Sequence, residues 1–387
     1  MANVGTGGSR RHPRLLGFSH FLDTGAMDRS HAVAIKRAER ICEQTDDERS
    51  LRISLLGEIR RVVPFDAFSW LLTDPETEVG CSPLADVPCL PELPRLIRLK
   101  YLTEVNRWTQ LDGPVALLST ATGGQLDRSL VWRALLRSYE VTDIASLVFR
   151  DRFGCWAFLE LWRVGRGTVF HESEAAFLAA ATPSITAALR RAIASTFHGG
   201  VQSQPTPGPV VLMLSPELAV KAQTPETENY LRLLVPPEGD RPPVPSAAYN
   251  VGAQLCAIEA GVDHHPATAR VHFSDGIWLT LRAARISDGS ARDVPADVAV
   301  TIERSSPGER LGVFALASGL TQRESDVLRQ LATGADTREL AKRMFVSEHT
   351  VQDHLKSIFD KTNTRSRNRL LAIATGTEAP KAGQLKL

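Results

Sequence analysis

The sequence predicts a multidomain protein with two consecutive α+β domains and an all-α C-terminal domain of four helices. Three observations lead to this prediction. The chain has 387 residues, which is long for a single hydrophobic core. Helical and strand-like periodicities alternate up to residue 304, whereas helical spacing alone follows from residue 320. A run rich in Gly, Pro and Gln at 198–209 divides the α+β part in two.

The composition narrows the class of protein. Hydrophobic residues make up 43% and charged residues 23%, as in ordinary soluble globular proteins. No apolar run is long enough to span a membrane, and no apolar segment follows Arg10 and Arg11 as in a secretory signal. A net charge of +1 argues against a globally basic nucleic-acid coat protein but allows a local basic patch. We expect the cysteines to be buried and reduced, as in a cytoplasmic protein. There are five of them: Cys42, Cys81, Cys89, Cys155 and Cys256.

The first α+β domain begins after a Gly-, Ser- and Arg-rich segment at 1–28, which we expect to be flexible. Two helices with one apolar face each follow from Ser30, and Pro64 ends the second. The stretch FSWLLTDPETEVGCSPL predicts two strands joined by a turn at 74–77. A helix over 93–102 comes next.

A second hairpin, with strands at 144–149 and 155–164, follows in the same domain. The stretch HESEAAFLAAATPSITAALRRAIA then predicts a long amphipathic helix. Ser173 is expected to cap this helix and Pro183 to kink or break it. This order of elements indicates an antiparallel sheet flanked by helices.

The element order of residues 29–196, together with the segments FDAFSWLLTDP and FHESEAAFLAAATPSI, resembles the GAF domain, a small-molecule sensing module. The Trp and Phe residues of strands 144–164 could line a ligand pocket, or could form the sheet core, because strand residues alternate between faces. No nucleophile–base pair, metal cluster or phosphate loop is present. We therefore predict no catalytic residue, no cofactor and no enzyme activity.

The second α+β domain, over 209–304, follows a linker at 197–208. The predicted elements are a strand, a Ser-Pro-Glu turn, a short strand, two helices and strands at 269–273, 277–286 and 298–303. This order is similar to that of a PAS domain. Asp263, His264 and His265, with His272 nearby, could suggest a metal, but no third ligand has the spacing of a known site. A solvated loop without metal is expected there.

The C-terminal region, 318–376, shows helical spacing with a capping residue before each helix. The predicted helices, with the residues that open them, are 325–332 (Thr321, Glu324), 337–344 (Asp336, Glu339), 348–361 (Ser347) and 366–374. Two short helices, a tight turn and a third helix with one apolar stripe make a helix-turn-helix. The stripe consists of Val351, Leu355, Ile358 and Phe359. The residues 377–387 are expected to form a flexible tail.

The opposite face of the helix over 348–361 is free to enter a DNA major groove. Lys356 can donate to guanine, Gln352 can pair with adenine, and Asp353 can accept from cytosine. Phosphate contacts are expected from the arginines beyond the helix, Arg365, Arg367 and Arg369. Between residues 320 and 372, ten basic residues face seven acidic ones, so this region is more positive than the whole chain.

The stretch LTQRESDVLRQLATGADTRELAKRMFVSEHTVQDHLKSIFDKTNTRSRNRLLA resembles the LuxR-type (NarL-type) DNA-binding domain. The resemblance implies transcriptional control and dimer binding to two half-sites of double-stranded DNA. By position it implies base reading by Gln352, Asp353 and Lys356. It also implies phosphate contacts at or near Ser347, Thr350 and Lys361. Thr362 and Asn363 stand where the family has leucine and glycine, and asparagine also suits a left-handed C-cap.

These inferences lead to a one-component, homodimeric transcription regulator whose N-terminal domains sense a small molecule or mediate dimerisation. A response regulator would need a receiver domain, and the first 150 residues show no arrangement of clustered acids, phosphoacceptor Asp and Lys. A signalling adaptor, whose α+β domains bind a protein partner, stays open as an alternative.

Overall fold

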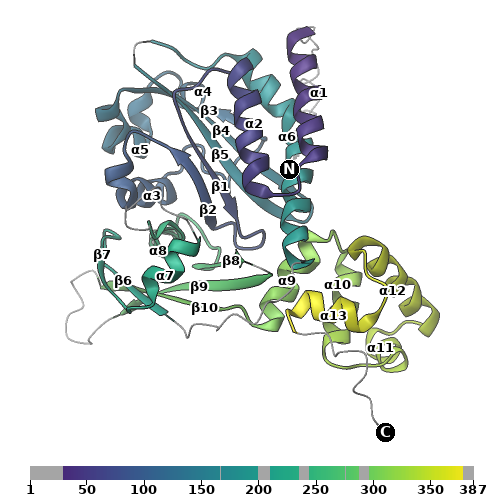
Figure 1. Ribbon diagram of the computed structural model, residues 1–387. Coiled ribbons are helices and arrows are strands. Elements are labelled where there is room, and N and C mark those ends of the chain that lie inside the picture. The colour runs from purple at the N-terminus through teal and green to yellow at the C-terminus, as the bar shows by residue number, and fades with distance from the viewer. Residues whose placement is uncertain are drawn as a thin grey trace, which may run out of the picture.

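The computed structural model describes residues 29–165, 167–198, 210–234, 244–274, 276–286 and 296–377. The predicted segment at 1–28, nearly all of the predicted linker and nearly all of the predicted tail lie outside these residues. Two antiparallel sheets with their helices precede a helical C-terminal domain (Figure 1). The predicted fold class, two α+β units followed by an all-α domain, is confirmed at this level.

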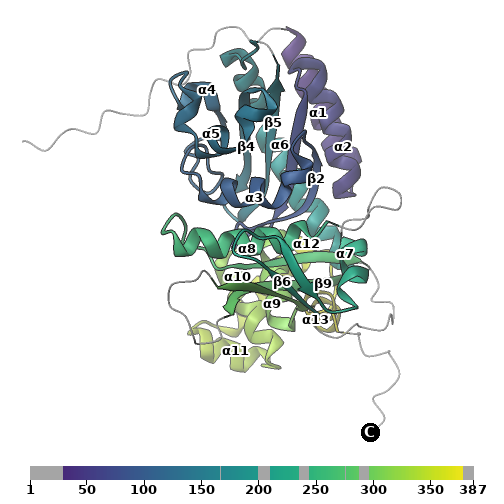
Figure 2. The ribbon, with the colours of Figure 1, turned by 90° about the vertical axis from the view of Figure 1, so that its left-hand side faces the viewer.

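The first sheet has the strand order β2-β1-β5-β4-β3. Its strands are β1 (Ala67–Thr73), β2 (Gly80–Asp86), β3 (Val115–Leu117), β4 (Val141–Asp151) and β5 (Gly154–Val164). The helices of this unit are α1 (Arg29–Gln44), α2 (Glu48–Val62), α3 (Leu93–Leu102), α4 (Leu118–Ala121), α5 (Leu130–Ala134) and α6 (Glu172–Ser195). Helices α1, α2 and α6 lie together on one side of the sheet, and α3, α4 and α5 on the other (Figures 1 and 2).

Helix α6 differs from the prediction at its start. His171, not Ser173, is the N-cap residue, and a capping box joins it to Glu174. The backbone N–H of His171 donates to Glu174 Oε2 at 2.8 Å, so the carboxylate satisfies the N–H of the N-cap residue. The helix continues for 24 residues through Pro183, which therefore does not break it. Proline has no backbone N–H, so Pro183 removes one hydrogen bond of the helix. The packing of α6 against α1 and the sheet contributes more free energy than this bond would.

The aromatic side chains of the central strands form the core of the first unit. Phe149, Trp156 and Trp162 are fully buried. Phe149 stacks on Trp70 with ring centroids 5.4 Å apart. The possibility that these strands form sheet core is therefore the one that the structure favours.

The second sheet has the strand order β7-β6-β10-β9-β8, so both sheets follow the same order along the chain. Its strands are β6 (Val210–Leu214), β7 (Val220–Gln223), β8 (Thr268–Ser274), β9 (Ile277–Ile286) and β10 (Asp297–Arg304). The helices of this unit are α7 (Thr227–Leu234) and α8 (Ser246–Glu259). Helix α8 lies between the units, against α3 and β2 on one side and β9 on the other (Figures 1 and 2).

A buried ion pair joins the two α+β units. Arg107 Nη2 lies 2.6 Å from Asp263 Oδ2, and both side chains are almost completely buried. His265 Nδ1 lies 2.7 Å from the other carboxylate oxygen. The prediction of a solvated loop is thus wrong for Asp263, because Arg107 of the first unit supplies the partner that a buried carboxylate needs. Within the described ranges, no group of His, Cys, Asp and Glu could hold a metal ion.

All five cysteines are free and buried, as predicted. In the described part of the chain, no helix combines the length and the apolar character needed to cross a membrane.

Over the described residues after β10, five helices follow: α9 (Pro307–Ala317), α10 (Gln322–Ala332), α11 (Thr337–Met344), α12 (Glu348–Thr362) and α13 (Arg367–Thr375). Helix α9 was not predicted. It follows β10 almost directly and is opened by a capping box between Ser306 and Glu309. The second unit is thereby joined to the C-terminal domain by a helix (Figure 1).

Candidate nucleic-acid interface

Local capping fixes the helices of the C-terminal domain where the sequence predicts them. Thr321 and Glu324 form the predicted capping box, although α10 starts at Gln322, three residues earlier than predicted. Asp336 accepts from the backbone N–H of Glu339 at 2.8 Å, and Ser347 accepts from that of Thr350 at 3.1 Å. Each of these bonds satisfies one of the free N–H groups at a helix start.

Helix α12 turns its apolar stripe inward. Val351, Leu355 and Ile358 are buried against α10 and α11. Thr362 is also buried, and its hydroxyl donates to the Ile358 carbonyl at 2.8 Å, so a polar side chain is accommodated in this position. Asn363 takes the left-handed C-cap conformation with φ of 49°, as predicted for this residue type.

The three predicted base-reading residues lie together on the exposed face of α12. Gln352, Asp353 and Lys356 are all exposed. The amide of Gln352 donates to the Thr337 hydroxyl at the start of α11, at 3.4 Å. The arrangement offers two donors and one carboxylate acceptor on one helix face, which suits hydrogen bonding to base edges.

The residues predicted to contact phosphates differ in how far hydrogen bonds within the chain already engage them. Lys361 Nζ lies 2.6 Å from Glu324 Oε2, and Ser357 donates to the other carboxylate oxygen at 2.6 Å. Arg367 donates to the Thr337 hydroxyl. Arg365 is exposed. Ser347 is exposed and Thr350 partly so, with hydroxyl oxygens 2.9 Å apart.

Glu324 therefore has a second role that the sequence did not reveal. Burial alone would raise the pKa of its carboxyl group, but hydrogen bonds from Lys361, Ser357 and Thr321 lower the pKa from 4.5 to about 2. The carboxylate ties the start of α10 to the last turns of α12. A capping box marks Glu324 in the sequence, but nothing there indicates its contacts with α12.

Helix α13, which carries Arg369, contacts the 3-10 turn at the end of the first unit. Burial lowers the pKa of His198, and the nearby charge of Arg369 lowers it further. His198 belongs to the 3-10 turn Thr196–His198 that ends the first unit, and Phe197 of this turn is buried. Arg369 is itself exposed, like Arg365.

Phe345, in the turn between α11 and α12, is a further residue that the sequence did not single out. Its backbone is left-handed, with φ of 56° and ψ of 43°, and it is the C-cap of α11. Its side chain is 95% exposed. A bulky residue with this backbone conformation is an outlier.

The opposite side of the domain is packed against the rest of the chain. Arg310 of α9 donates to the Ile373 carbonyl of α13 at 3.0 Å and to the Gly276 carbonyl of the second unit. Its guanidinium also lies 4.8 Å from the ring centroid of Phe197. Burial lowers the pKa of Arg310 to about 10, and Arg304 acts in the same direction. Arg190 of α6 donates to the Ala317 carbonyl at 3.4 Å.

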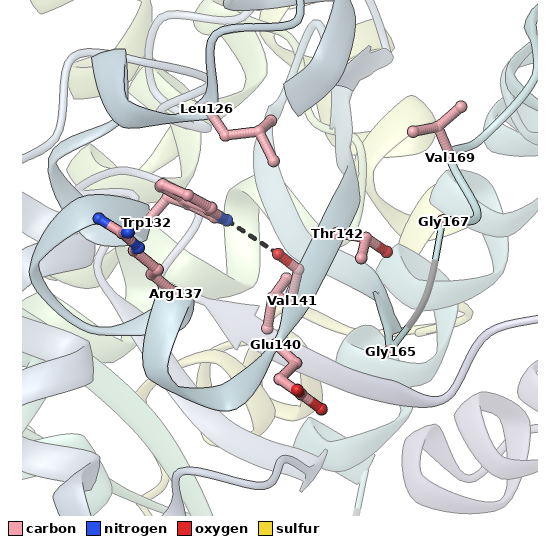
Figure 3. A pocket seen from close by; sticks show the side chains of 9 residues that line it. All are labelled: Leu126, Trp132, Arg137, Glu140, Val141, Thr142, Gly165, Gly167 and Val169. Atoms are coloured by element: carbon pink, nitrogen blue, oxygen red, sulfur yellow. Dashed lines mark hydrogen bonds between the residues drawn. The ribbon is translucent and has the colours of Figure 1, made fainter.

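A hollow of about 450 Å³ lies at one end of the first sheet (Figure 3). Leu126, Trp132, Val141 and Val169 supply apolar groups to its lining. The indole N–H of Trp132 donates to the Val141 carbonyl at 2.8 Å and holds the ring in place. None of the core aromatic residues of the strands lines this hollow.

Comparison with known proteins places the C-terminal domain in a family. Residues 318–374 match the bacterial regulatory proteins of the luxR family and therefore form a LuxR-type helix-turn-helix domain. A nitrate/nitrite response regulator protein homolog from Haemophilus influenzae is 46% identical over 48 residues, which is 12% of this chain and 23% of that protein. The uncharacterized transcriptional regulatory protein YxjL from Bacillus subtilis is 32% identical over 94 residues, which is 24% of this chain and 43% of that protein.

The chain thus spans less than half the length of these two relatives. A crystal structure of Escherichia coli SdiA gives a TM-score of 0.32 at 11% identity, over 89% of this chain and 98% of that chain. A score at this level does not establish a common fold for the whole chain.

Proposed function

We propose that the protein is a one-component transcriptional regulator of LuxR type that acts in the cytoplasm and binds operator DNA through α12. One observation carries this proposal: within a LuxR-family domain, Gln352, Asp353 and Lys356 share one exposed helix face. Base edges in the major groove match these donors and this acceptor. Ser347, Thr350, Arg365 and Arg367 are proposed to contact phosphates, with Lys361 in a lesser role because of its bond to Glu324.

The two α+β units are proposed to be a GAF-like sensor at 29–196 and a PAS-like domain at 209–304, followed by the DNA-binding domain at 318–376. Their common strand order supports two units of related architecture. We further propose that the protein is a homodimer on two half-sites. A small-molecule effector or a partner would favour one arrangement of the two DNA-binding domains.

A protein partner for the α+β units is a second candidate, and one observation favours it. The central aromatic residues are packed into the core, and none of them lines the hollow of Figure 3, which lies at one end of the first sheet. Thermal unfolding of the full chain in the presence of metabolite mixtures distinguishes a small-molecule effector from a protein partner. A raised midpoint favours a small-molecule effector, because a ligand that binds only the folded state stabilises it.

The central test is binding of the full chain to genomic DNA fragments at two salt concentrations, beside a Lys356→Ala variant. We expect selective binding that weakens with salt, and a loss of selectivity in the variant of about 1–3 kcal/mol. The exposed Lys36 of α1 offers a matched control, since Lys36→Ala removes the same charge far from α12. Equal DNA binding by the native chain and Lys356→Ala would contradict the assigned role.

A further inference from the structure

We propose that the ring of Phe345 contacts apolar groups of the DNA groove wall, either deoxyribose carbons or thymine methyl groups. This contact forms when the N-terminal end of α12 enters the major groove, and the inference therefore rests on the proposed function. It adds an uncharged contact to an interface otherwise made of hydrogen bonds and charges.

Intramolecular packing does not account for a phenylalanine at this position. A left-handed backbone brings the β-carbon of any residue other than glycine too close to its carbonyl oxygen, and it is most unfavourable for a bulky side chain. The 95% exposure of Phe345 means that folding recovers almost none of the free energy available from burying the ring. Strained residues of this kind cluster at functional sites.

The other helices of the domain provide an internal comparison. Helices α12 and α13 also end on left-handed C-caps, with φ of 49° at Asn363 and 71° at Gly376. Asparagine and glycine are the residue types that tolerate this conformation. Of these three left-handed caps, only the one at position 345 carries a residue type for which this backbone conformation is unfavourable. It is also the cap that directly precedes the predicted DNA-reading helix.

The position of Phe345 points to DNA as the partner. It lies three residues before Glu348, the first residue of α12, and a recognition helix reaches bases with its N-terminal residues. The surroundings suit a polyanion. Lys342 and Arg343 are exposed in the last turn of α11, and the N-terminus of α12 carries partial positive charge. Glu339, paired with Arg343, and Glu348 are the acids near this end.

The test compares Phe345→Asn with the native full-length chain in binding to the DNA fragments that the native chain selects. Asparagine suits the left-handed backbone, so the variant should fold at least as stably as the native chain. We expect DNA affinity to fall by about fivefold to tenfold, the effect of losing one partly buried apolar contact. The slope of log affinity against log salt should stay unchanged, because no charge is removed.

Ile53→Asn on α2 is the matched control, because Ile53 is a 51% exposed apolar residue far from α12. It should leave DNA affinity unaltered. A loss in Phe345→Asn that is equal on all fragments assigns the contact to the sugars, and a loss confined to fragments with a flanking thymine assigns it to the methyl group. Unaltered affinity in Phe345→Asn, with selectivity lost in Lys356→Ala, overturns the inference alone. Absence of binding by the native chain removes the proposed function as well.

Discussion

The two sides of the C-terminal domain differ in what covers them. On the α12 side, Gln352, Asp353 and Lys356 are exposed. On the α13 side, Leu370 and Ile373 are buried, and Arg310 holds the last turn of the helix against the rest of the chain. The domain is therefore docked without its predicted DNA-reading residues being covered. If the proposed effector acts on this domain, it therefore has no need to unmask α12.

The largest effect should come from the docked side. Arg310→Ala removes the donors to the Ile373 and Gly276 carbonyls and leaves a cavity beside Phe197. We expect the free energy of unfolding to fall by about 2–4 kcal/mol. Chemical denaturation of the full chain measures this.

Arg310→Met provides the control for this prediction. It keeps most of the side-chain volume and removes a cation whose Nε has no hydrogen-bond partner among the described residues. Both variants remove the buried charge, and the methionine variant should lose less stability than the alanine variant because its side chain fills most of the cavity beside Phe197. Equal losses in both would show that side-chain volume matters little here and that the lost hydrogen bonds of Arg310 account for the effect.

A smaller loss of stability is expected when the contact between α10 and α12 is weakened. Glu324→Gln replaces the carboxylate that accepts from Lys361 and Ser357. We expect a loss of about 1–3 kcal/mol in the free energy of unfolding, since hydrogen bonds to a charged group are weakened. A variant as stable as the native chain would show that the network contributes nothing.

The same carboxylate makes the stability of this domain depend on pH. The pKa of Glu324 is lowered from 4.5 to about 2 in the folded chain. The stabilisation is therefore complete above pH 4.5 and is lost as the pH falls toward 2. Unfolding measured across this range should show a steeper decline for the native chain than for Glu324→Gln. Parallel curves would argue against the assigned ionisation.

DNA binding should distinguish Arg365 from Lys361. Arg365 is exposed, whereas the charge of Lys361 is paired with Glu324. Arg365→Ala should reduce the salt slope of DNA binding by about 0.9, the value for one phosphate contact. Lys361→Ala should change this slope less and lower stability instead. The reverse order would mean that Lys361 leaves Glu324 when DNA binds.

The smallest effect is expected at Thr337, which accepts hydrogen bonds from both Gln352 and Arg367. Thr337→Val keeps the shape of the side chain and removes the acceptor. DNA affinity should fall by no more than about 1 kcal/mol, because Gln352 loses orientation but stays in place. The matched control is the same substitution, Thr333→Val, at the C-cap of α10. The DNA affinity of this variant should equal that of the native chain.

Sequence reasoning succeeded where structure is decided within a few residues. The caps at Thr321, Asp336 and Ser347 and the left-handed Asn363 were all readable, because a capping side chain bonds to backbone groups two or three residues away. Helix α9 was missed, although its capping box of Ser306 and Glu309 could have revealed it.

Contacts between distant segments were out of reach. Asp263 was expected in a solvated loop, and its partner Arg107 lies 156 positions away in the sequence. The contacts of Arg310 with Phe197 and Ile373 depend equally on how the units pack. The face of α12 was predictable because helical periodicity places its residues, whereas the partners of Glu324 and Lys361 belong to tertiary packing.

The position of α8 between the two sheets also has a consequence for synthesis on the ribosome. The surfaces of β2 and α3 that α8 covers are translated long before α8 itself. Roughly 170 residues separate Asp86 from Glu259, so at about 5–20 residues per second the delay is roughly 9–35 s. During that interval the nascent first unit presents an uncovered apolar surface, and chaperones that bind such surfaces would have time to engage it.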